Sequence, residues 1–313
     1  MNIFEGFDQL GNIPNPVLTI GTFDGVHVGH QKIIQRLNEE AEKIGGESVL
    51  FTFYPHPRMV LYPNSHGLKL IQTQAEKLDK LRRMGLKNVI VHPFTMDFSR
   101  LTAVEFVRDY LVNRLHVKKL VIGYDHQFGK NREGSIEFLR EVSDLYGYEV
   151  LEISAQEIDE VNVSSTKIRK AIISGDIDQA NAFLGEPYVL NGKVVKGKAL
   201  GRSIGFPTAN IDIESDTKLI PQLGVYAVNV TLPSGVRKMG MMNIGNRPTV
   251  GAQNDVSIEV NLFDFEEDLY GQHITVQLLS RFRDEMKFNS VSELTAQLAQ
   301  DEKTIRTYFT SLV

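Results

Sequence analysis

The residues best suited to chemistry lie between positions 21 and 30, in the run Gly-Thr-Phe-Asp-Gly-Val-His-Val-Gly-His. Glycine allows the backbone to turn tightly and to approach a ligand closely. His27 and His30 are three residues apart and therefore project from one face of a helical turn. Imidazoles beside a helix N-terminus can bond phosphate oxygens, where charge builds up during nucleotidyl transfer. A metal site or plain surface is the alternative, but a run between an expected strand and an expected helix favours a phosphate site.

A second polar run, Val-Ser-Ser-Thr-Lys-Ile-Arg at 163–169, is expected to open a helix. Taken alone it would be an ordinary N-cap, because Ser and Thr hydroxyls satisfy the first helical N–H groups. Combined with the histidine run, these hydroxyls and the side chains of Lys167 and Arg169 could grip phosphates. We therefore expect the two runs to form the two jaws of a nucleotide clamp.

A third run, at 197–210, reads Gly-Lys-Ala-Leu-Gly-Arg-Ser-Ile-Gly-Phe-Pro-Thr-Ala-Asn. Its glycines allow the backbone to wrap a phosphate. The hydroxyl of Thr208 and the amide oxygen of Asn210 are suitable ligands for Mg²⁺, which takes few protein ligands besides substrate phosphates. The sequence contains neither a P-loop nor the protein-kinase motifs, so it disfavours both of those kinase types.

The first 186 residues must position the two clamp runs, and their pattern predicts an α/β domain. Short β-rich runs alternate with segments whose apolar residues have helical spacing, which indicates a parallel sheet with helices on both faces. Ligands bind at the carboxyl ends of the strands in such sheets. The expected strands are 17–21, 48–53, 88–91, 119–123 and 149–153, and the expected helices are 31–44, 74–84 and 103–115, with helix stops at Gly45, Gly85 and Gly147.

The pattern changes near residue 186, and residues 187–313 predict a second domain. There β-rich runs follow one another directly, separated by turn signals, which is typical of a small antiparallel β-barrel. The expected strands are 189–195, 208–213, 225–231, 238–243, 256–265 and 273–281, and a terminal helix is expected over 290–313.

Composition limits the possible functions. The 313 residues carry a net charge of −5, which makes a broad nucleic-acid-binding face a poor expectation. Cysteine is absent from the sequence, so disulfides, thiolate metal sites and cysteine nucleophiles are excluded. No apolar stretch approaches the ~20 residues of a membrane helix, and residues 1–12 do not resemble a secretory signal. We expect a cytoplasmic protein that needs no nucleic acid, membrane or obligate protein partner.

The two clamp runs resemble the HxGH nucleotidyltransferase superfamily and its Ser-Ser-Thr-x-x-Arg signature. More closely, the N-terminal half resembles the FMN adenylyltransferase module of the prokaryotic bifunctional riboflavin kinase/FAD synthetases. The loops Phe-Tyr-Pro-His-Pro-Arg at 53–58 and Gly-Tyr-Asp-His-Gln-Phe-Gly at 123–129 match that family too. The resemblance implies that His27 and His30 are catalytic. It implies that phosphates are bound by Gly21, Phe23, Asp24, Gly25, Gly29, Ser164, Ser165, Thr166 and Arg169, and the flavin by Pro55, Pro57, Arg58, Asp125 and Phe128. Some family members have Asn at position 125.

The run at 197–210 resembles the riboflavin kinase module of the same family. The resemblance implies that Thr208 and Asn210 bind Mg²⁺ and the ATP phosphates, and that Glu259 is the base that takes the proton of the ribityl 5′-hydroxyl. It places Gly197, Gly201, Arg202 and Gly205 at the phosphates and Arg281, Met286 and Phe288 at the riboflavin ring. Many relatives have His where this chain has Asn261. We expect little effect of this difference on the chemistry, although the local hydrogen bonds must differ.

The resemblance implies a bifunctional enzyme in which residues 187–313 phosphorylate riboflavin and residues 1–186 join AMP from a second ATP to FMN. The products would be FMN, FAD and pyrophosphate, with Mg²⁺ as cofactor. Two alternatives stay open. One half could be a flavin- or nucleotide-binding regulator without turnover. A tRNA-directed nucleotidyl enzyme shares the histidine signature, but no basic surface or Lys-Met-Ser-Lys-Ser run supports it.

Overall fold

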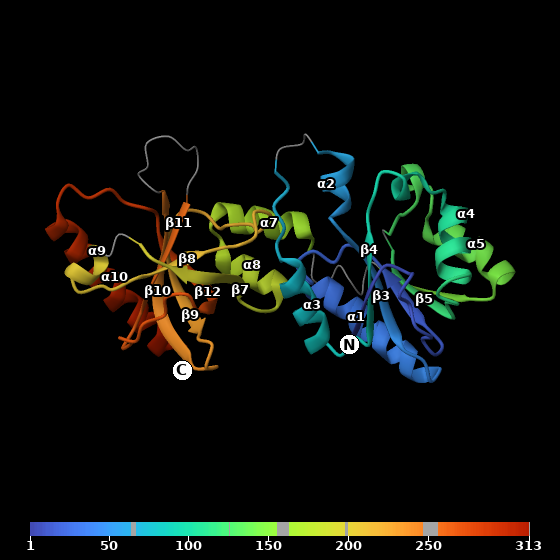
Figure 1. Ribbon diagram of the computed structural model, residues 1–313, viewed down its shortest axis with the longest axis horizontal. Coiled ribbons are helices and arrows are strands. Elements are labelled where there is room, and N and C mark those ends of the chain that lie inside the picture. The colour runs from blue at the N-terminus through green and yellow to red at the C-terminus, as the bar shows by residue number, and fades with distance from the viewer. Residues whose placement is uncertain (64–66, 125, 155–162, 198–199, 247–255, 313) are drawn as a thin grey trace. The chain divides into compact units, whose positions relative to one another are not determined.

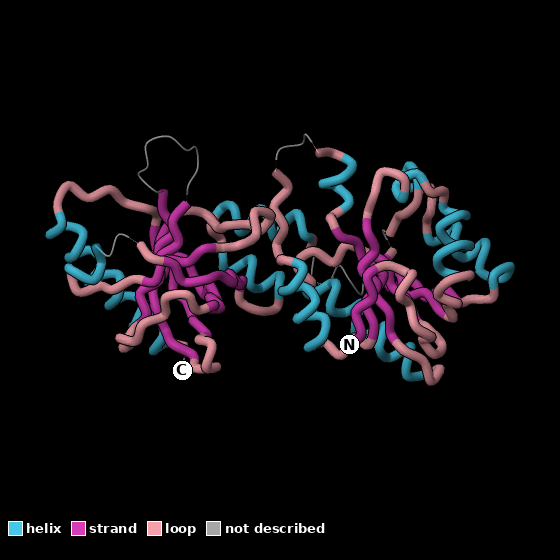
Figure 2. Tube along the Cα trace, in the orientation of Figure 1, coloured by secondary structure: helices cyan, strands magenta, loops and turns pink. Residues whose placement is uncertain are grey.

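The computed structural model describes residues 1–63, 67–124, 126–154, 163–197, 200–246 and 256–312. The chain divides into two compact units, Met1–Ser165 and Thr166–Val313, and each is described by itself (Figures 1 and 2). This division falls about twenty residues before the predicted domain boundary at 186. The intervening helices α7 (Ser165–Ser174) and α8 (Ile177–Leu184) are counted with the second unit. Asn181 of α8 explains part of this, because its side chain donates hydrogen bonds to Leu278 O and Leu279 O.

The first unit contains the predicted parallel sheet, which has six strands rather than the five expected. The strands are β1 (Asn2–Glu5), β2 (Val17–Ile20), β3 (Ser48–Tyr54), β4 (Asn88–Pro93), β5 (Lys119–Gly123) and β6 (Glu149–Ile153). Their order in the sheet is β1-β4-β3-β2-β5-β6, so the chain reverses its direction of progress between β2 and β5. In such sheets ligands bind at this switch point, beyond the carboxyl ends of the strands. The loop after β2 is the predicted histidine run.

The central strands β2 and β3 bury both of their faces, because successive side chains point to opposite sides of the sheet. Leu18 and Phe51 belong to one apolar core, with α4 (Ala103–Phe106) and α5 (Ile136–Tyr146). Val17 and Leu50 belong to the other, with α1 (Val28–Lys43) and α3 (Gln74–Arg83). The remaining helical segments are α2 (Pro57–Leu61), two short 3₁₀ turns at Phe98–Arg100 and Lys130–Arg132, and a π-helical turn at Val107–Val112. The segment predicted as one helix over 103–115 is therefore four α-helical residues followed by the π turn.

The second unit contains the predicted closed antiparallel barrel. Its strands are β7 (Tyr188–Val195), β8 (Ala209–Asp212), β9 (Gly224–Thr231), β10 (Arg237–Asn246), β11 (Val256–Leu262) and β12 (His273–Arg283), in the order β10-β11-β8-β7-β12-β9. A short helix α9 (Leu200–Ser203) precedes β8, and the predicted terminal helix is α10 (Val291–Ser311). α10 packs on the outside of the barrel, where Ile305 and Phe309 share an apolar cluster with Met241 and Phe263.

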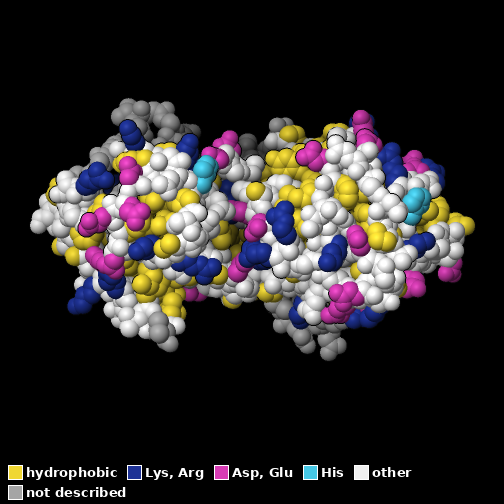
Figure 3. Space-filling view, turned by 60° about the horizontal axis from the view of Figure 1, so that its bottom comes forward, with side chains coloured by type: hydrophobic (Ala, Val, Ile, Leu, Met, Phe, Trp, Pro, Cys, Tyr) yellow, Lys and Arg dark blue, Asp and Glu magenta, His cyan; other side chains and the backbone are white. Residues whose placement is uncertain are grey.

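Charges of both signs are interspersed on the face of the molecule drawn in Figure 3. Within the described residues, no helix combines the length and the apolar character that a membrane crossing requires.

Candidate active sites

The turn after β2 has an unusual backbone. Phe23, Gly25 and Val26 all have positive φ, at 49°, 90° and 36°. Such values are rare for residues with a side chain and persist only where the surroundings hold them. Here Phe23 and Val26 are buried in the core beside α1, and this packing holds the turn. The turn therefore brings the backbone and the histidines that follow it to the switch point of the sheet.

His27 and His30 lie face to face at the start of α1. Their ring centroids are 3.6 Å apart with an interplanar angle of 16°, and His30 also stacks on Phe23 at 4.4 Å. His27 is the N-cap of α1, and its Nδ1 accepts a hydrogen bond from the His30 backbone N at 3.3 Å. An accepting Nδ1 places the proton of the neutral ring on Nε2. The predicted shared face of the two histidines is therefore present, and Nε2 of His27 is a donor.

Both histidines are neutral in the free protein near pH 7. Burial lowers the pKa of His27 to about 4, and the charge of Lys80 acts in the same direction. Burial, followed by His27, Lys80 and Lys77, holds the pKa of His30 well below its ordinary value. A bound polyphosphate would raise both pKa values, because an adjacent negative charge favours the imidazolium form.

Gly29 and Asp24 help to position the histidine turn. A Cβ on Gly29 would lie 3.3 Å from both His27 Nδ1 and Val163 Cγ1, which is tighter than ordinary packing, so glycine lets the ring and the chain at 163 approach. The buried carboxylate of Asp24 accepts hydrogen bonds from the backbone N of Ile71 and Gln72. Asp24 thus ties the turn to the segment before α3.

The Ser-Ser-Thr run meets the same turn. Ser165 donates from its hydroxyl to the backbone O of Asp24 at 2.9 Å, so the structure brings the beginning of the second jaw to the first. Ser164 precedes α7, while Thr166 and Arg169 lie on α7 and are counted with the second unit. Gly21 precedes the turn, and a Cβ there would lie 2.9 Å from the Phe23 ring.

Lys77 was not predicted to belong to this site. Its buried Nζ donates to Thr22 O and to Thr52 Oγ1, both at 3.2 Å. Burial lowers its pKa to about 8, although Asp24 opposes the shift. The sequence does carry a signal, because Lys77 and Lys80 share the helical stripe of α3 with the buried Leu81. Two lysines on a buried face are unusual unless charge is needed there.

The described residues predicted to hold the flavin of the first unit follow the carboxyl ends of β3 and β5. Pro55 and Arg58 are exposed after β3, and Pro57 is the first residue of α2. Phe128 is half-buried, and its ring contacts Phe106 at a centroid distance of 5.4 Å. Asp125 lies outside the described residues.

The second predicted site is built on β8 and β11. The hydroxyl of Thr208 donates a hydrogen bond to Glu259 Oε2 at 3.1 Å. Asn210 of β8 is the register partner of Glu259, and Asn243 of β10 is its partner on the other side. The structure therefore brings together the threonine, the asparagine and the carboxylate that lie about fifty residues apart in the sequence.

Three glycines accommodate this arrangement. A Cβ on Gly197 would collide with the Asn210 amide, and one on Gly201 would collide with Phe206 O. Gly205 has a φ of +86° that favours glycine. Arg202 lies exposed on α9. The predicted glycines thus allow close approach to the Pro-Thr-Ala-Asn run.

The closing segment is less clearly a ligand site. Nη2 of Arg281 donates to Leu223 O at 2.6 Å and forms an ion pair with Asp284. Met286 is 48% exposed and Phe288 is half-buried. Glu285, which was not predicted, accepts a hydrogen bond from Asn246 N at 3.0 Å and ties this segment to the end of β10.

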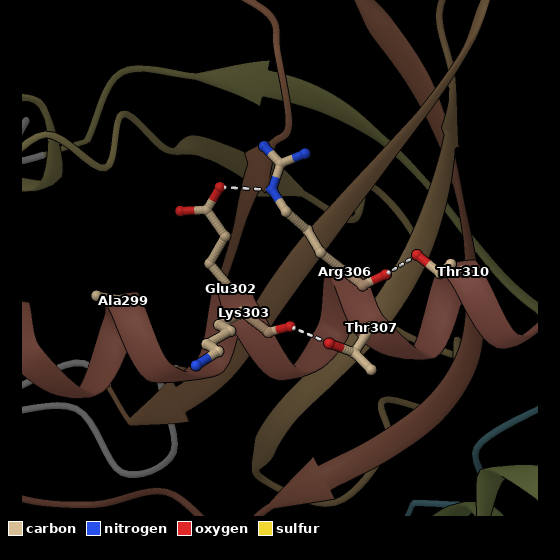
Figure 4. Close-up of a pocket in the computed structure, with 6 residues that line it drawn as sticks. All are labelled: Ala299, Glu302, Lys303, Arg306, Thr307 and Thr310. Carbon is tan, nitrogen blue, oxygen red and sulfur yellow. Dashed lines mark hydrogen bonds and ion pairs between the residues drawn. The ribbon is translucent and has the colours of Figure 1, made fainter.

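Two hollows of the surface are lined by none of the predicted site residues. One, of about 450 Å³, follows a single face of α10 (Figure 4), and its lining residues are Ala299, Glu302, Lys303, Arg306, Thr307 and Thr310. Arg306 is bonded to Glu302 there, and the two threonine hydroxyls donate to backbone carbonyls of the helix. The other lies at the amino ends of β5 and β6.

The described residues contain no group of three or more His, Asp or Glu side chains that could hold a metal ion. Thr208 and Asn210 offer a hydroxyl and an amide oxygen beside a carboxylate. Oxygen donors of this kind fit Mg²⁺ that is bound mainly through substrate phosphates.

Comparison with known proteins identifies the family. The FAD synthetase family matches residues 11–167, and the riboflavin kinase family matches residues 184–309. Two relatives are named bifunctional riboflavin kinase/FMN adenylyltransferase. The one from Listeria monocytogenes is 40% identical over 95% of this chain and 94% of its own. The one from Escherichia coli K12 is 39% identical over 99% and 98%.

A solved structure covers nearly the same length. The crystal structure described as a macrolide-efflux protein from Streptococcus pneumoniae has a TM-score of 0.89 and 34% sequence identity, over 97% of this chain and 98% of that one. The two family matches and the extent of the relatives agree with the parallel sheet and the closed barrel found here. The chain belongs to the family of bifunctional riboflavin kinase/FMN adenylyltransferases.

Proposed function

We propose that this protein makes FAD from riboflavin in two steps, with phosphoryl transfer at the Thr208–Glu259 site and adenylyl transfer at the His27–His30 site. The substrates are riboflavin and two molecules of ATP, and FMN is the intermediate. Residues 1–186 are proposed as the adenylyltransferase domain and residues 187–313 as the kinase domain. The contact between Thr208 and Glu259 carries the proposal, since it pairs a cation ligand with a base at one point.

In the kinase step, the ribityl 5′-oxygen attacks the γ-phosphorus of ATP while its proton passes to the Glu259 carboxylate. The bond between the γ-phosphorus and the β–γ bridging oxygen breaks, and ADP leaves. Thr208 bonds Oε2 of Glu259, which leaves Oε1 to accept the proton. Because the Thr208 hydroxyl directs its hydrogen toward Glu259 in a hydrogen bond, the lone pairs of its oxygen can face a cation.

Thr208 and Asn210 would hold Mg²⁺ together with the ATP phosphates. The ion would neutralise charge on the phosphate oxygens during transfer. The glycines at 197, 201 and 205 and the exposed Arg202 would contribute backbone and guanidinium donors to the same phosphates.

In the adenylyl step, an oxygen of the FMN phosphate attacks the α-phosphorus of ATP. The bond to the α–β bridging oxygen breaks, and pyrophosphate leaves. His27 Nε2 and His30 would donate to the phosphate oxygens on which charge develops, and fixed donors at those positions lower the barrier. The first turn of α1 adds its free N–H groups, and Ser165 holds the turn from the side of the second jaw.

The flavin would lie against the loop of Pro55, Pro57 and Arg58 and the ring of Phe128. Aromatic side chains continue from this loop into the core, since Phe53 contacts Phe98 at a centroid distance of 5.7 Å. A flat aromatic ligand can extend such a cluster by stacking. Arg281, Met286 and Phe288 are the corresponding proposal for riboflavin in the kinase domain. A cytoplasmic location belongs to the same proposal, because both steps consume ATP.

The test is to incubate the purified protein with riboflavin, ATP and Mg²⁺ and to separate the flavins by chromatography over time. FMN should form first and FAD should follow at its expense. A folded sample that forms neither flavin would refute the proposal. A sample that forms FMN but never converts supplied FMN would leave the first unit as a binding module.

A further inference from the structure

Asn261 lies two residues after Glu259 on β11, and its side chain therefore points to the same side of the strand. It is 7% exposed. Its Nδ2 donates a hydrogen bond to the backbone O of Pro207 at 2.8 Å. Pro207 directly precedes Thr208, so this bond ends one residue away from the hydroxyl that faces Glu259.

The Pro-Thr-Ala-Asn run has few other ties at this point. β8 contains four residues and begins at Ala209. Two register pairs, Glu259 with Asn210 and Val260 with Ala209, join it to β11, and its pairing with β7 begins only at Asn210. Ahead of the strand, Phe206 packs into the apolar cluster that α10 completes. Between that cluster and the first ladder pair, the Asn261 amide holds the backbone of the run through its hydrogen bond to Pro207 O.

We propose that Asn261 is a positioning residue for phosphoryl transfer, whose amide fixes the Pro207 carbonyl and thereby sets the Thr208 hydroxyl against Glu259 and the ATP phosphates. This inference rests on the proposed kinase activity of the second unit. Asn261 touches no reacting atom and acts through Pro207 and Thr208. A purely structural amide would support the barrel without influencing the use of ATP.

Asn261→Asp is the sharpest variant, because it preserves the shape of the side chain and, when ionised, replaces the donor with a negatively charged acceptor. At pH 8 an ionised carboxylate would face the Pro207 carbonyl. The Pro207 carbonyl then lacks its hydrogen-bond donor. If the lost hydrogen-bond free energy raises the barrier to phosphoryl transfer, kcat/KM of FMN formation should fall by about tenfold to a hundredfold. The Mg²⁺ concentration for half-maximal rate should rise, because Thr208 is displaced.

The pH profile separates positioning from general damage. The carbonyl favours the protonated form of the introduced carboxyl group, which can again donate to it, and this raises its pKa. The ratio of variant to wild-type FMN formation should therefore recover as the pH falls from 8 to 5.5. Asn261→Leu should lose activity without any recovery.

Thermal unfolding gives a readout that is independent of activity. A carboxyl group whose pKa is raised on folding stabilises the protein at low pH and loses that contribution as the pH rises. The difference in Tm between wild type and Asn261→Asp should narrow as the pH falls. Asn191→Asp on β7 is the matched control, since Oδ1 of Asn191 accepts from Thr275 at 2.6 Å and an acid preserves this acceptor. It should behave as wild type in FMN formation.

The outcomes are distinct. If the wild-type protein forms no FMN, the proposed function fails. If the wild type forms FMN and Asn261→Asp matches it at every pH, the positioning role of Asn261 is overturned and the proposed function stands. A fall in Tm of Asn261→Asp with kcat/KM and the Mg²⁺ dependence of FMN formation unchanged also overturns it, because a merely structural amide would alter stability without altering the use of ATP.

Discussion

The imidazole of His27 is stacked on that of His30 with 3.6 Å between the ring centroids. Two cations at this distance would repel, and His27 adds to the effect of burial in holding the pKa of His30 low. The pair is therefore uncharged until an anion arrives. A triphosphate at the start of α1 would supply that charge, and the free protein keeps donors there without a permanent positive charge on either ring.

The histidines should make the first unit sensitive to acid. His27 has its pKa lowered from 6.5 to about 4, so between these values the unfolded chain binds a proton that the folded chain does not. The free energy of unfolding should therefore fall as the pH drops from 6.5 to 4, by up to about 3 kcal/mol for this group. Urea unfolding at several pH values checks this. In His27→Gln the free energy of unfolding should depend less steeply on pH. If the free energies of wild type and variant fall in parallel with pH, the lowered pKa of His27 is contradicted.

Gly29→Ala should impair FAD formation from FMN, because the added Cβ would lie 3.3 Å from His27 Nδ1 and push the ring aside. A displacement of a few tenths of an ångström at reacting groups corresponds to about a tenfold loss in kcat. Alanine favours a helix over glycine, so stability should not fall. Gly11→Ala is the control in the same unit, since nothing lies within 4 Å of its added Cβ. Equal activity of the two variants would count against the explanation.

Lys77→Met should raise the KM for ATP in the adenylyl step, because it removes a buried positive charge and leaves Thr22 O without that donor. The variant should also change how the free energy of unfolding depends on pH above pH 8. Lys77 has its pKa lowered from 10.5 to about 8 on folding, so the wild-type protein should gain unfolding free energy as the pH rises from 8 to 10.5. This rise should be smaller in Lys77→Met. FMN formation is the internal control and should be unaffected.

Thr208→Val should reduce FMN formation by about a hundredfold, because the methyl group can neither donate to Glu259 nor face a cation. FAD formation from supplied FMN should persist. Thr275→Val on β12 is the matched control, since its hydroxyl bonds Asn191 elsewhere on the barrel. A Thr208→Val protein that forms FMN at the wild-type rate would exclude a role for this hydroxyl.

Much of the fold could be predicted because buried strands and helix stripes have distinct periods. β2 to β6 and all six barrel strands lie where apolar runs indicated them. β1 was not predicted, because its four residues are mostly solvent-facing and pair only with β4 at the sheet edge. The π turn at Val107–Val112 also could not be predicted, since its apolar spacing resembles that of an α-helix over so short a stretch.

Prediction of the site was limited by contacts between distant segments. The histidine run could be found because its residues are consecutive. Lys77 reaches Thr22 and Thr52 only through tertiary packing, and Asn261 reaches Pro207 across 54 positions. The resemblance implied that Arg281 faces the riboflavin ring, but it could not show that Leu223 and Asp284 engage its guanidinium. The flavin-facing role of Arg281 stays a prediction.

The most direct test compares Glu259→Gln and His30→Ala in one assay that follows FMN and FAD separately. If the two reactions take place at separate sites, Glu259→Gln should form no FMN from riboflavin but should convert supplied FMN to FAD. His30→Ala should accumulate FMN and form no FAD. If either substitution abolishes both steps while the protein remains folded, the account of two separate sites is contradicted.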